Sequence, residues 1–177
     1  IMEHLIVGIH QAEPGSGITD AERERYRHAG VQILVLPEYF WVRAGDSDHV
    51  ASANHASEDL ALMASWTRED RWVLVGGTFV EHGGGEVYYN TCPVFHEGAE
   101  IGRYRKIHLM PGEARHGLHP GNGFLILEVL GKRLAPVICA DMNQSGGPPD
   151  SADLDLFICN GLCASRPCIL CYWVVEW

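Results

Sequence analysis

The chain has 177 residues, of which 46% are apolar and 20% are charged, as in an ordinary globular protein. Its 13 basic and 23 acidic residues give a net charge of −10, which argues against nucleic acid, because phosphate binding depends on clustered Lys and Arg. No apolar run approaches the ~18 residues of a membrane span, and the opening lacks the pattern of a secretory signal. The sequence therefore predicts one domain that acts away from membranes and needs no disulfide or metal to fold.

Strands and helices alternate in the first half of the chain. A capping box of Thr19 and Glu22 opens a short charged helix that ends near Ala29, before Gly30. Apolar residues on one face predict a second helix over 52–69. Apolar runs predict strands at 5–9, 31–36, 72–79 and 87–95. Turns are predicted at 82–86 and 97–104.

The second half of the chain has the pattern of hairpins. A loop rich in Pro, Gly and His covers 108–123, and a hairpin over 124–139 turns at Gly131-Lys132. Residues 142–152 cannot form a helix, because two glycines and two prolines interrupt them. A further strand is predicted over 153–159. Together the elements predict an α/β protein with a mixed sheet packed against helices.

Three reactive residues each come just beyond an apolar strand. Glu38 follows ILVLP, Lys106 follows GRYR, and Cys139 ends LAPVI. Strand ends that meet at one edge of a sheet are where α/β enzymes collect catalytic groups. A thiolate can attack a carbonyl or nitrile carbon, a carboxylate can carry the proton, and an ammonium can favour the thiolate and stabilise an oxyanion. Taken singly, each residue also fits an ordinary role, as a buried thiol, a solvated acid or part of a basic patch.

Together, the segments around these residues resemble a known family. LVLPEYF at 34–40, GRYRKIHLMPGE at 102–113 and PVICAD at 136–141 look like the three signature blocks of the nitrilase superfamily of carbon–nitrogen hydrolases, in the same order. The resemblance covers roughly residues 5–160. It implies a nitrilase-like α-β-β-α sandwich, complete or incomplete, with a carbon–nitrogen hydrolase domain over 1–160 and a divergent apolar segment over 161–177.

The resemblance also implies roles for individual residues. Glu38 would be the general base, Lys106 would stabilise the oxyanion, and Cys139 would be the nucleophile. Glu113, in PGE, matches a second glutamate that many family members carry, and would orient Lys106 or the substrate. The backbone of Ala140 would complete the oxyanion hole with Lys106.

The implied activity is that of a cofactor-free thiol hydrolase. Its substrate would be a small non-peptide amide or N-carbamoyl compound, and less readily a nitrile, because RKIHLMPGE resembles the amidase and carbamoylase branches more closely. The alternative is an inactive, truncated relative that acts in binding or assembly, since family domains are longer and usually follow the nucleophile with a helix. A homo-oligomer in the cytoplasm is expected, and self-association would use the apolar residues 168–177.

Other residues support weaker hypotheses. Tyr39, Phe40 and Trp41 would line the substrate pocket or, equally, pack in the core. Histidines in the 108–123 loop could bind a metal with Glu113, but their spacing fits no known ligand set, so a polar loop is the favoured interpretation. These histidines are His108, His116 and His119.

The cysteines allow a further alternative. Six in all are too few for a disulfide scaffold, which favours a reducing cytoplasm. Four of them lie within residues 159–171 and could hold zinc, although only Cys168 and Cys171 have the usual spacing. No metal is therefore expected.

Overall fold

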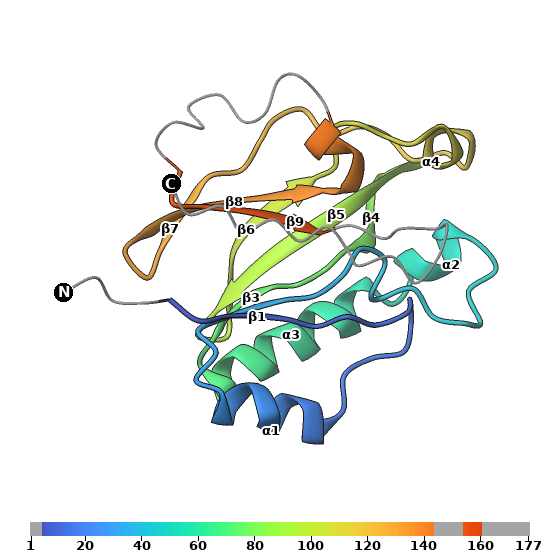
Figure 1. The fold of residues 1–177 in the computed structure, drawn as a ribbon. Helices are drawn as coiled ribbons and strands as arrows, with labels where there is room; N and C mark the ends of the chain where they lie inside the picture. The colour runs from blue at the N-terminus through green and yellow to red at the C-terminus, as the bar shows by residue number, and fades with distance from the viewer. Residues whose placement is uncertain (1–4, 144–153, 161–177) are drawn as a thin grey trace.

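The computed structural model describes residues 5–143 and 154–160 of the chain, so the segment 161–177 lies outside the described residues (Figure 1). The α-helices are α1 (Asp20–His28), α2 (His49–Ala53), α3 (Ala56–Asp70) and α4 (Pro111–Arg115), and a 3-10 turn, η1, covers Cys139–Asn143. The strands are β1 (Val7–Ile9), β2 (Ile33–Val35), β3 (Val73–Val75), β4 (Phe79–Gly84), β5 (Val87–His96), β6 (Ala99–Arg105), β7 (Leu127–Val129), β8 (Lys132–Ile138) and β9 (Leu156–Asn160).

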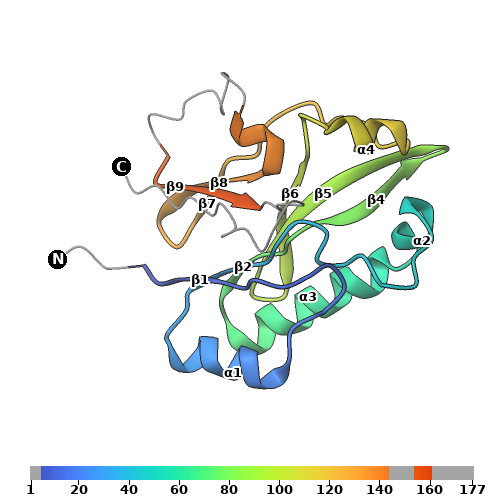
Figure 2. The same ribbon diagram turned by 45° about the vertical axis from the view of Figure 1, so that its right-hand side comes forward.

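The strands form two sheets. In the first, β1, β2 and β3 run parallel, and β5 lies antiparallel to β3, β4 and β6. In the second, β8 pairs antiparallel with β7 and parallel with β9. Helices α1 and α3 cover one side of the first sheet and the second sheet covers the other (Figures 1 and 2). The described residues thus supply α, β and β layers of the predicted sandwich, and the α/β fold class is confirmed.

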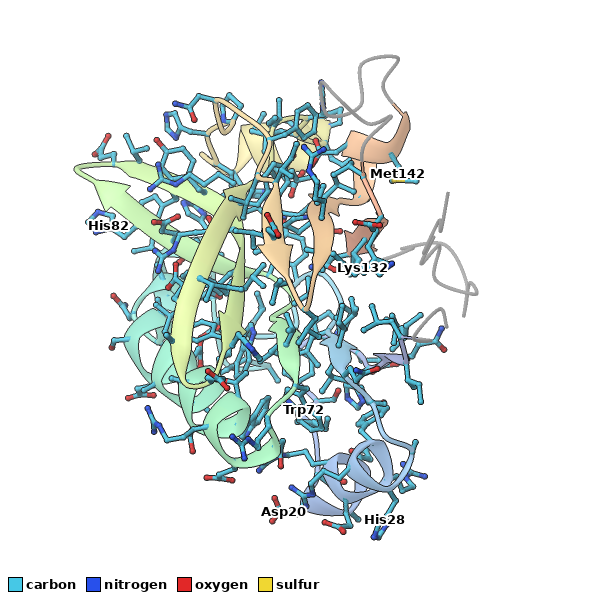
Figure 3. The ribbon with its side chains drawn as sticks, turned by 90° about the vertical axis from the view of Figure 1, so that its left-hand side faces the viewer. Asp20, His28, Trp72, His82, Lys132 and Met142 are labelled. Carbon is cyan, nitrogen blue, oxygen red and sulfur yellow. The ribbon has the colours of Figure 1, made fainter. Side chains whose placement is uncertain are left out.

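The alternation of side chains along β2 explains why apolar residues form two separate clusters. Successive side chains of a strand point to opposite faces. Ile33 and Val35 therefore join the cluster between the sheets, whereas Leu34 packs toward the helices. The cluster between the sheets includes Leu134 and Ile138 of β8, the strand that leads to Cys139. This packing fixes the end of β8 relative to the first sheet. Figure 3 labels Lys132 at the start of β8 and Met142 in η1, just beyond the end of the strand.

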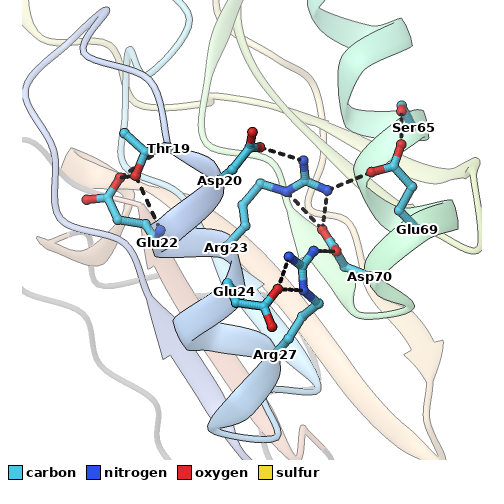
Figure 4. A network of polar contacts seen from close by, with 9 residues as sticks. All are labelled: Thr19, Asp20, Glu22, Arg23, Glu24, Arg27, Ser65, Glu69 and Asp70. Carbon is cyan, nitrogen blue, oxygen red and sulfur yellow. Dashed lines mark hydrogen bonds and ion pairs between the residues drawn. The ribbon is translucent and has the colours of Figure 1, made fainter.

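Polar contacts begin α1 and join it to α3 on the helix side of the first sheet. The predicted capping box is present, with Thr19 N donating to Glu22 and Glu22 N donating to Thr19 Oγ1. From the next turn of α1, Arg23 donates to Asp70 at the end of α3 at 2.6 Å (Figure 4). The capping box begins α1, and the ion pair fixes α1 against α3.

Several predicted boundaries were wrong because pairing and local turns override apolar patterns. The helix predicted over 52–69 is two helices, separated by a turn at residues 54–55 whose bonds span three residues rather than four. The predicted turn over 97–104 is mostly β6, since only Glu97 and Gly98 turn the chain, both with positive φ. The loop 108–123 contains the short helix α4.

Two strands also differ from their predicted ranges. The strand predicted over 72–79 is interrupted at Gly76 and Gly77, so β3 and β4 pair with successive parts of β5. Strand β4 then runs into the predicted turn over 82–86. The last predicted strand, 153–159, is observed as β9 over Leu156–Asn160.

Within the described residues, no helix is long and apolar enough to cross a membrane.

Candidate active site

Glu38 lies in the turn that follows β2, and the glycine pair between β3 and β4 shapes this turn. Gly77 has a φ of +67°, and a Cβ at this position would lie only 2.5 Å from the carbonyl oxygen of Pro37. Thr78 then accepts a hydrogen bond from the Tyr39 backbone N–H at 2.7 Å. The interruption between β3 and β4 therefore holds the Glu38 turn, and Glu38 itself is only 3% exposed.

The Lys106 ammonium is buried between two carboxylates. Its Nζ lies 2.8 Å from Glu38 Oε1 and 2.8 Å from Glu113 Oε2, and the side chain is 1% exposed. Lys106 directly follows β6, and Glu113 belongs to α4, where it also accepts the Met110 backbone N–H. The turn after β2 and the segment from the end of β6 to α4, which are distant in the sequence, thus meet at one end of the first sheet.

Asn90 belongs to the same group of contacts, although sequence reasoning did not find it. Its Nδ2 donates to Glu38 Oε1 at 2.9 Å and to Glu113 Oε1 at 2.8 Å. Its backbone carbonyl accepts the Lys106 N–H at 2.9 Å. One residue therefore contacts both carboxylates through its side-chain amide and the lysine backbone through its own backbone carbonyl. We call Glu38, Asn90, Lys106 and Glu113 the Lys106 cluster.

Charge and burial act in opposite directions within the Lys106 cluster. Burial alone would lower the pKa of Lys106, but Glu38 and Glu113 outweigh it and raise that pKa. Burial would raise the pKa of Glu113, but hydrogen bonds from Lys106 and Tyr39 outweigh it and lower that pKa. Both groups stay charged at neutral pH as a result.

Cys139 follows β8 at a strained position. Its φ is +45°, in the left-handed region that non-glycine residues rarely adopt. Such a conformation costs about 1–3 kcal/mol and persists only where the surroundings enforce it. Cys139 is the first residue of η1 and is half-buried, whereas Cys92 and Cys159 are buried. The turn thus brings a free thiol to the end of β8 in the second sheet.

Lys106 favours the thiolate of Cys139, as the sequence predicts, but burial and Glu38 outweigh its effect. Burial raises the pKa of Cys139, and so do the charge of Glu38 and a hydrogen bond with it, whereas Lys106 lowers it. The net result is a pKa of about 11. Two carboxylates beside one ammonium leave an excess of negative charge, which opposes a further anion. The resting thiol is therefore protonated, with the Glu38 carboxylate as its hydrogen-bond partner.

The residues predicted to line a substrate pocket separate into two groups. The Tyr39 hydroxyl donates to Glu113 Oε1, and burial together with this bond raises the pKa of Tyr39. Phe40 and Trp41 instead pack in the core toward the helices, where the Trp41 indole donates to Gly76 O at 2.6 Å. Their placement corresponds to the core-packing alternative. Ala140 directly follows Cys139 within η1.

The histidines that were considered as metal ligands lie in different surroundings. His108 contacts Asp141 at 2.9 Å, whereas the Leu118–His119 segment lies along β5, with His119 N donating to Tyr88 O at 2.7 Å. Within residues 5–143 and 154–160, no group of three or more His, Cys, Asp or Glu side chains could hold a metal ion. Of the cysteines considered for zinc, only Cys159 lies among the described residues.

The site thus places a buried glutamate–lysine–glutamate group beside a half-buried cysteine, at the ends of strands in an α/β sandwich. The family model for carbon–nitrogen hydrolases matches residues 16–147, and the chain belongs to this family. The predicted membership of the nitrilase superfamily is thereby confirmed.

Curated relatives agree with this assignment. The chain is 32% identical over 123 residues to omega-amidase NIT2-B of Xenopus laevis, a match that covers 64% of this chain and 44% of the relative. It is 28% identical over 137 residues to a nitrilase of Pyrococcus abyssi (strain GE5 / Orsay), which covers 73% of this chain and 51% of the relative. The chain thus spans about half the length of the curated relatives it matches.

Solved structures share the fold. An amidase from Nesterenkonia sp. AN1 superposes with a TM-score of 0.79 at 21% identity, over 94% of this chain and 72% of the amidase. A carbon–nitrogen hydrolase from Helicobacter pylori G27 gives a TM-score of 0.70 at 18% identity, over 89% of this chain and 59% of the other. One structure of the Nesterenkonia amidase carries acrylamide added to its active-site cysteine.

Proposed function

We propose that this chain carries the catalytic centre of a cysteine-dependent hydrolase that cleaves the C–N bond of a small, non-peptide amide or N-carbamoyl compound. The observation that supports this proposal most directly is the Lys106 ammonium, held 2.8 Å from both Glu38 and Glu113. A buried cation with two anionic partners, next to a thiol that is hydrogen-bonded to one of them, is suited to acyl transfer.

The raised pKa of Cys139 determines how the first step proceeds. Because the thiol is protonated at neutral pH, Glu38 takes its proton as the sulfur attacks the carbonyl carbon. The carbonyl oxygen becomes an oxyanion, which the Lys106 ammonium and the Ala140 N–H stabilise. When the C–N bond breaks, protonated Glu38 returns the proton to the departing nitrogen, and a thioester remains on Cys139.

Water completes the reaction. Glu38, again a carboxylate, takes a proton from water as the water oxygen attacks the thioester carbon. The C–S bond then breaks, the carboxylic acid leaves, and the sulfur regains its proton from Glu38. Glu113 takes no part in these transfers. It holds Lys106 in place and accepts hydrogen bonds from Tyr39 and Asn90.

Relatives support amides over nitriles as substrates. Several of the curated matches are omega-amidases, and amidases are among the similar solved structures. The proposal also includes a reducing, cytoplasmic location, consistent with the free thiols of Cys92, Cys139 and Cys159. It further includes assembly into a homo-oligomer, which sedimentation of the full chain tests.

The test combines turnover with the mass of the intact protein. The full chain is incubated with acetamide, propionamide, an N-carbamoyl amino acid and acetonitrile, and ammonia release is measured. We expect ammonia from an amide or the N-carbamoyl compound, and an acyl adduct that peptide mapping locates on Cys139. Cys139→Ala is expected to abolish both, whereas Cys92→Ala, which removes a buried thiol of β5, is expected to retain both.

Two results would contradict the proposal. Turnover by Cys139→Ala would exclude Cys139 as the nucleophile. A folded chain that releases no ammonia and forms no adduct with any of the four compounds would favour the alternative function in binding or assembly.

A further inference from the structure

The carboxylate of Asp141 joins the two segments that carry Lys106 and Cys139. Its side chain is 0% exposed. From the first sheet and the loop after it, Oδ2 accepts the Tyr104 hydroxyl at 2.7 Å, and Oδ1 accepts both the backbone N–H and the ring Nδ1 of His108, at 2.8 and 2.9 Å. From the second sheet, Oδ2 accepts the Ile138 backbone N–H at 3.2 Å.

The donors to Asp141 lie close in the sequence to Lys106 and to Cys139. Tyr104 and His108 lie on either side of Lys106, two residues away in each direction. Ile138 and Asp141 lie on either side of Cys139. One buried carboxylate therefore fixes the backbone around the cation to the backbone around the nucleophile, although the two belong to different sheets.

The bond to Ile138 also acts on the strained turn. Asp141 accepts the N–H of the residue three positions earlier, which closes a short loop around Cys139. Cys139 has its φ of +45° inside this loop. A side chain that closes a turn in this way satisfies a backbone donor and stabilises a conformation that the local sequence disfavours.

We propose that Asp141 is a positioning residue for the reaction, which sets the placement of the Cys139 sulfur relative to the Lys106 ammonium. This inference rests on the proposed function. Asp141 does not touch the reacting atoms in this role. It acts through the Cys139 turn and through the segment from Tyr104 to His108, and His108 serves as a second support for Asp141.

A carboxylate at the other end of β8 offers a control. Asp155 accepts the Arg133 backbone N–H at 2.8 Å, so it contacts β8 near the start of the strand as Asp141 does at its end. Asp155→Asn alters a strand contact of the same kind away from Cys139. It is expected to keep kcat within about threefold of the wild-type value, as is usual for substitutions outside the core and the site.

The experiment measures kcat and KM for an amide together with the rate at which iodoacetamide alkylates Cys139. Asp141→Asn is expected to lower kcat about 10²-fold with KM nearly unchanged, because small misplacements of reacting groups cost rates of this order. The alkylation rate of Cys139 should change at the same time. Tyr104→Phe removes one bond and is expected to lower kcat about 2–10-fold, the effect of one hydrogen bond.

The alkylation rate separates this inference from the proposed function, because it needs no turnover. If the wild-type chain hydrolyses no amide, the proposed function fails, but a changed alkylation rate in Asp141→Asn and not in Asp155→Asn still supports the coupling. Wild-type kcat and alkylation rate in a folded Asp141→Asn variant would overturn the inference. If Asp141→Asn does not fold, wild-type kcat and alkylation rate in both Tyr104→Phe and His108→Ala would overturn it.

Discussion

Two pairs of adjacent residues, one in β5 and one at the end of β6, each contribute one residue to either of two clusters of charged side chains. Asn90 contacts the Lys106 cluster, whereas the adjacent Thr91 donates to Glu81 at 2.9 Å. Lys106 likewise lies between two carboxylates, whereas the adjacent Arg105 donates to Glu81 at 2.9 Å. Because successive side chains of a strand point to opposite faces, one cluster faces the second sheet and the other lies on the helix side.

The pKa of an acidic group shifts in opposite directions at the two clusters. Glu81 also accepts from Arg103 at 2.8 Å, so its carboxylate contacts two guanidinium groups. The Arg103 guanidinium also pairs with Glu100 at 2.6 Å. We call Glu81, Thr91, Arg103 and Arg105 the Glu81 cluster. Burial opposes the ionisation of Glu81, but the hydrogen bonds from Arg105, Arg103 and Thr91 outweigh it and lower its pKa to about 2. In the Lys106 cluster, two carboxylates face one ammonium, and burial together with the charge of Glu38 raises the pKa of the neighbouring Cys139 thiol to about 11.

Adjacent polar or cationic side chains can therefore serve different purposes. Thr91 and Arg105 stabilise the fold through Glu81, whereas Asn90 and Lys106 hold the carboxylates beside Cys139. The guanidinium groups and the hydroxyl that contact Glu81 stabilise an anion that is already present in the folded protein. Excess negative charge beside Cys139 disfavours the free thiolate, so the thiol loses its proton only as the sulfur attacks a substrate. The following predictions test this contrast.

The largest expected effect is the pH dependence of Cys139 alkylation. With a pKa of about 11, the thiolate fraction should rise about tenfold per pH unit, which gives about 10³-fold between pH 7 and pH 10. Iodoacetamide kinetics with peptide mapping measure this. Glu113→Gln removes one negative charge and should move the profile to lower pH, whereas Glu81→Gln should leave it in place. A plateau below pH 9 would contradict a raised pKa.

The second prediction compares adjacent cations. Lys106→Gln keeps a donor but removes the buried charge, and should lower kcat about 10²–10³-fold, the usual effect of losing one oxyanion donor. Arg105→Gln removes the same charge from the Glu81 cluster, and should keep kcat within about threefold. Amide turnover of both variants, with circular dichroism to confirm folding, measures the difference. Equal losses of kcat would show that position relative to Cys139 does not matter.

The third prediction compares adjacent polar residues of β5. Asn90→Leu keeps the approximate shape and the backbone carbonyl that accepts the Lys106 N–H, but removes the amide that holds Glu38 and Glu113. It should lower kcat about 10–10²-fold, since each bond to a charged group contributes about 1.5–3 kcal/mol. Thr91→Val removes one bond to Glu81 and should affect stability rather than kcat. Unchanged kcat in Asn90→Leu would exclude a positioning role for Asn90.

Asn90 also shows why part of the site could not be predicted from the sequence. Glu38, Lys106 and Cys139 each follow a strand, and the family resemblance added Glu113, so their meeting could be anticipated. Asn90 lies inside β5, where an isolated polar residue has no local signal. Its partners come from segments that are 52 and 23 residues away, and only the packed fold brings them together.

The same limit explains the errors in the fold and in the electrostatics. Apolar runs predicted a strand over 72–79, but the glycine pair that interrupts it acts through its close approach to Pro37, which no local pattern reveals. The direction of the pKa shift at Cys139 depends on the balance of two carboxylates, one ammonium and burial. The sequence identified Lys106 as a favourable neighbour, but the sum of these effects follows only from the folded positions.

The smallest expected effect concerns stability and the Glu81 cluster. The folded-state pKa of Glu81, about 2, lies below its ordinary value of 4.5, so the carboxylate contributes stability above pH 4.5 and loses it as the pH falls toward 2. Arg105 is 40% exposed, and solvent screens its share. Glu81→Gln should therefore lower the free energy of unfolding by about 1–2 kcal/mol at pH 7.

Urea unfolding at pH 7 and at pH 3 measures this contribution. The difference between the wild-type chain and Glu81→Gln should shrink at pH 3, because the Glu81 carboxyl of the unfolded chain, with its ordinary pKa of 4.5, is then largely protonated, whereas that of the folded chain is not. Glu128→Gln, at an exposed position of β7, is the control and should change the free energy of unfolding by less than about 0.5 kcal/mol at either pH. A difference that is as large at pH 3 as at pH 7 would show that Glu81 stabilises the fold by packing rather than by its charge.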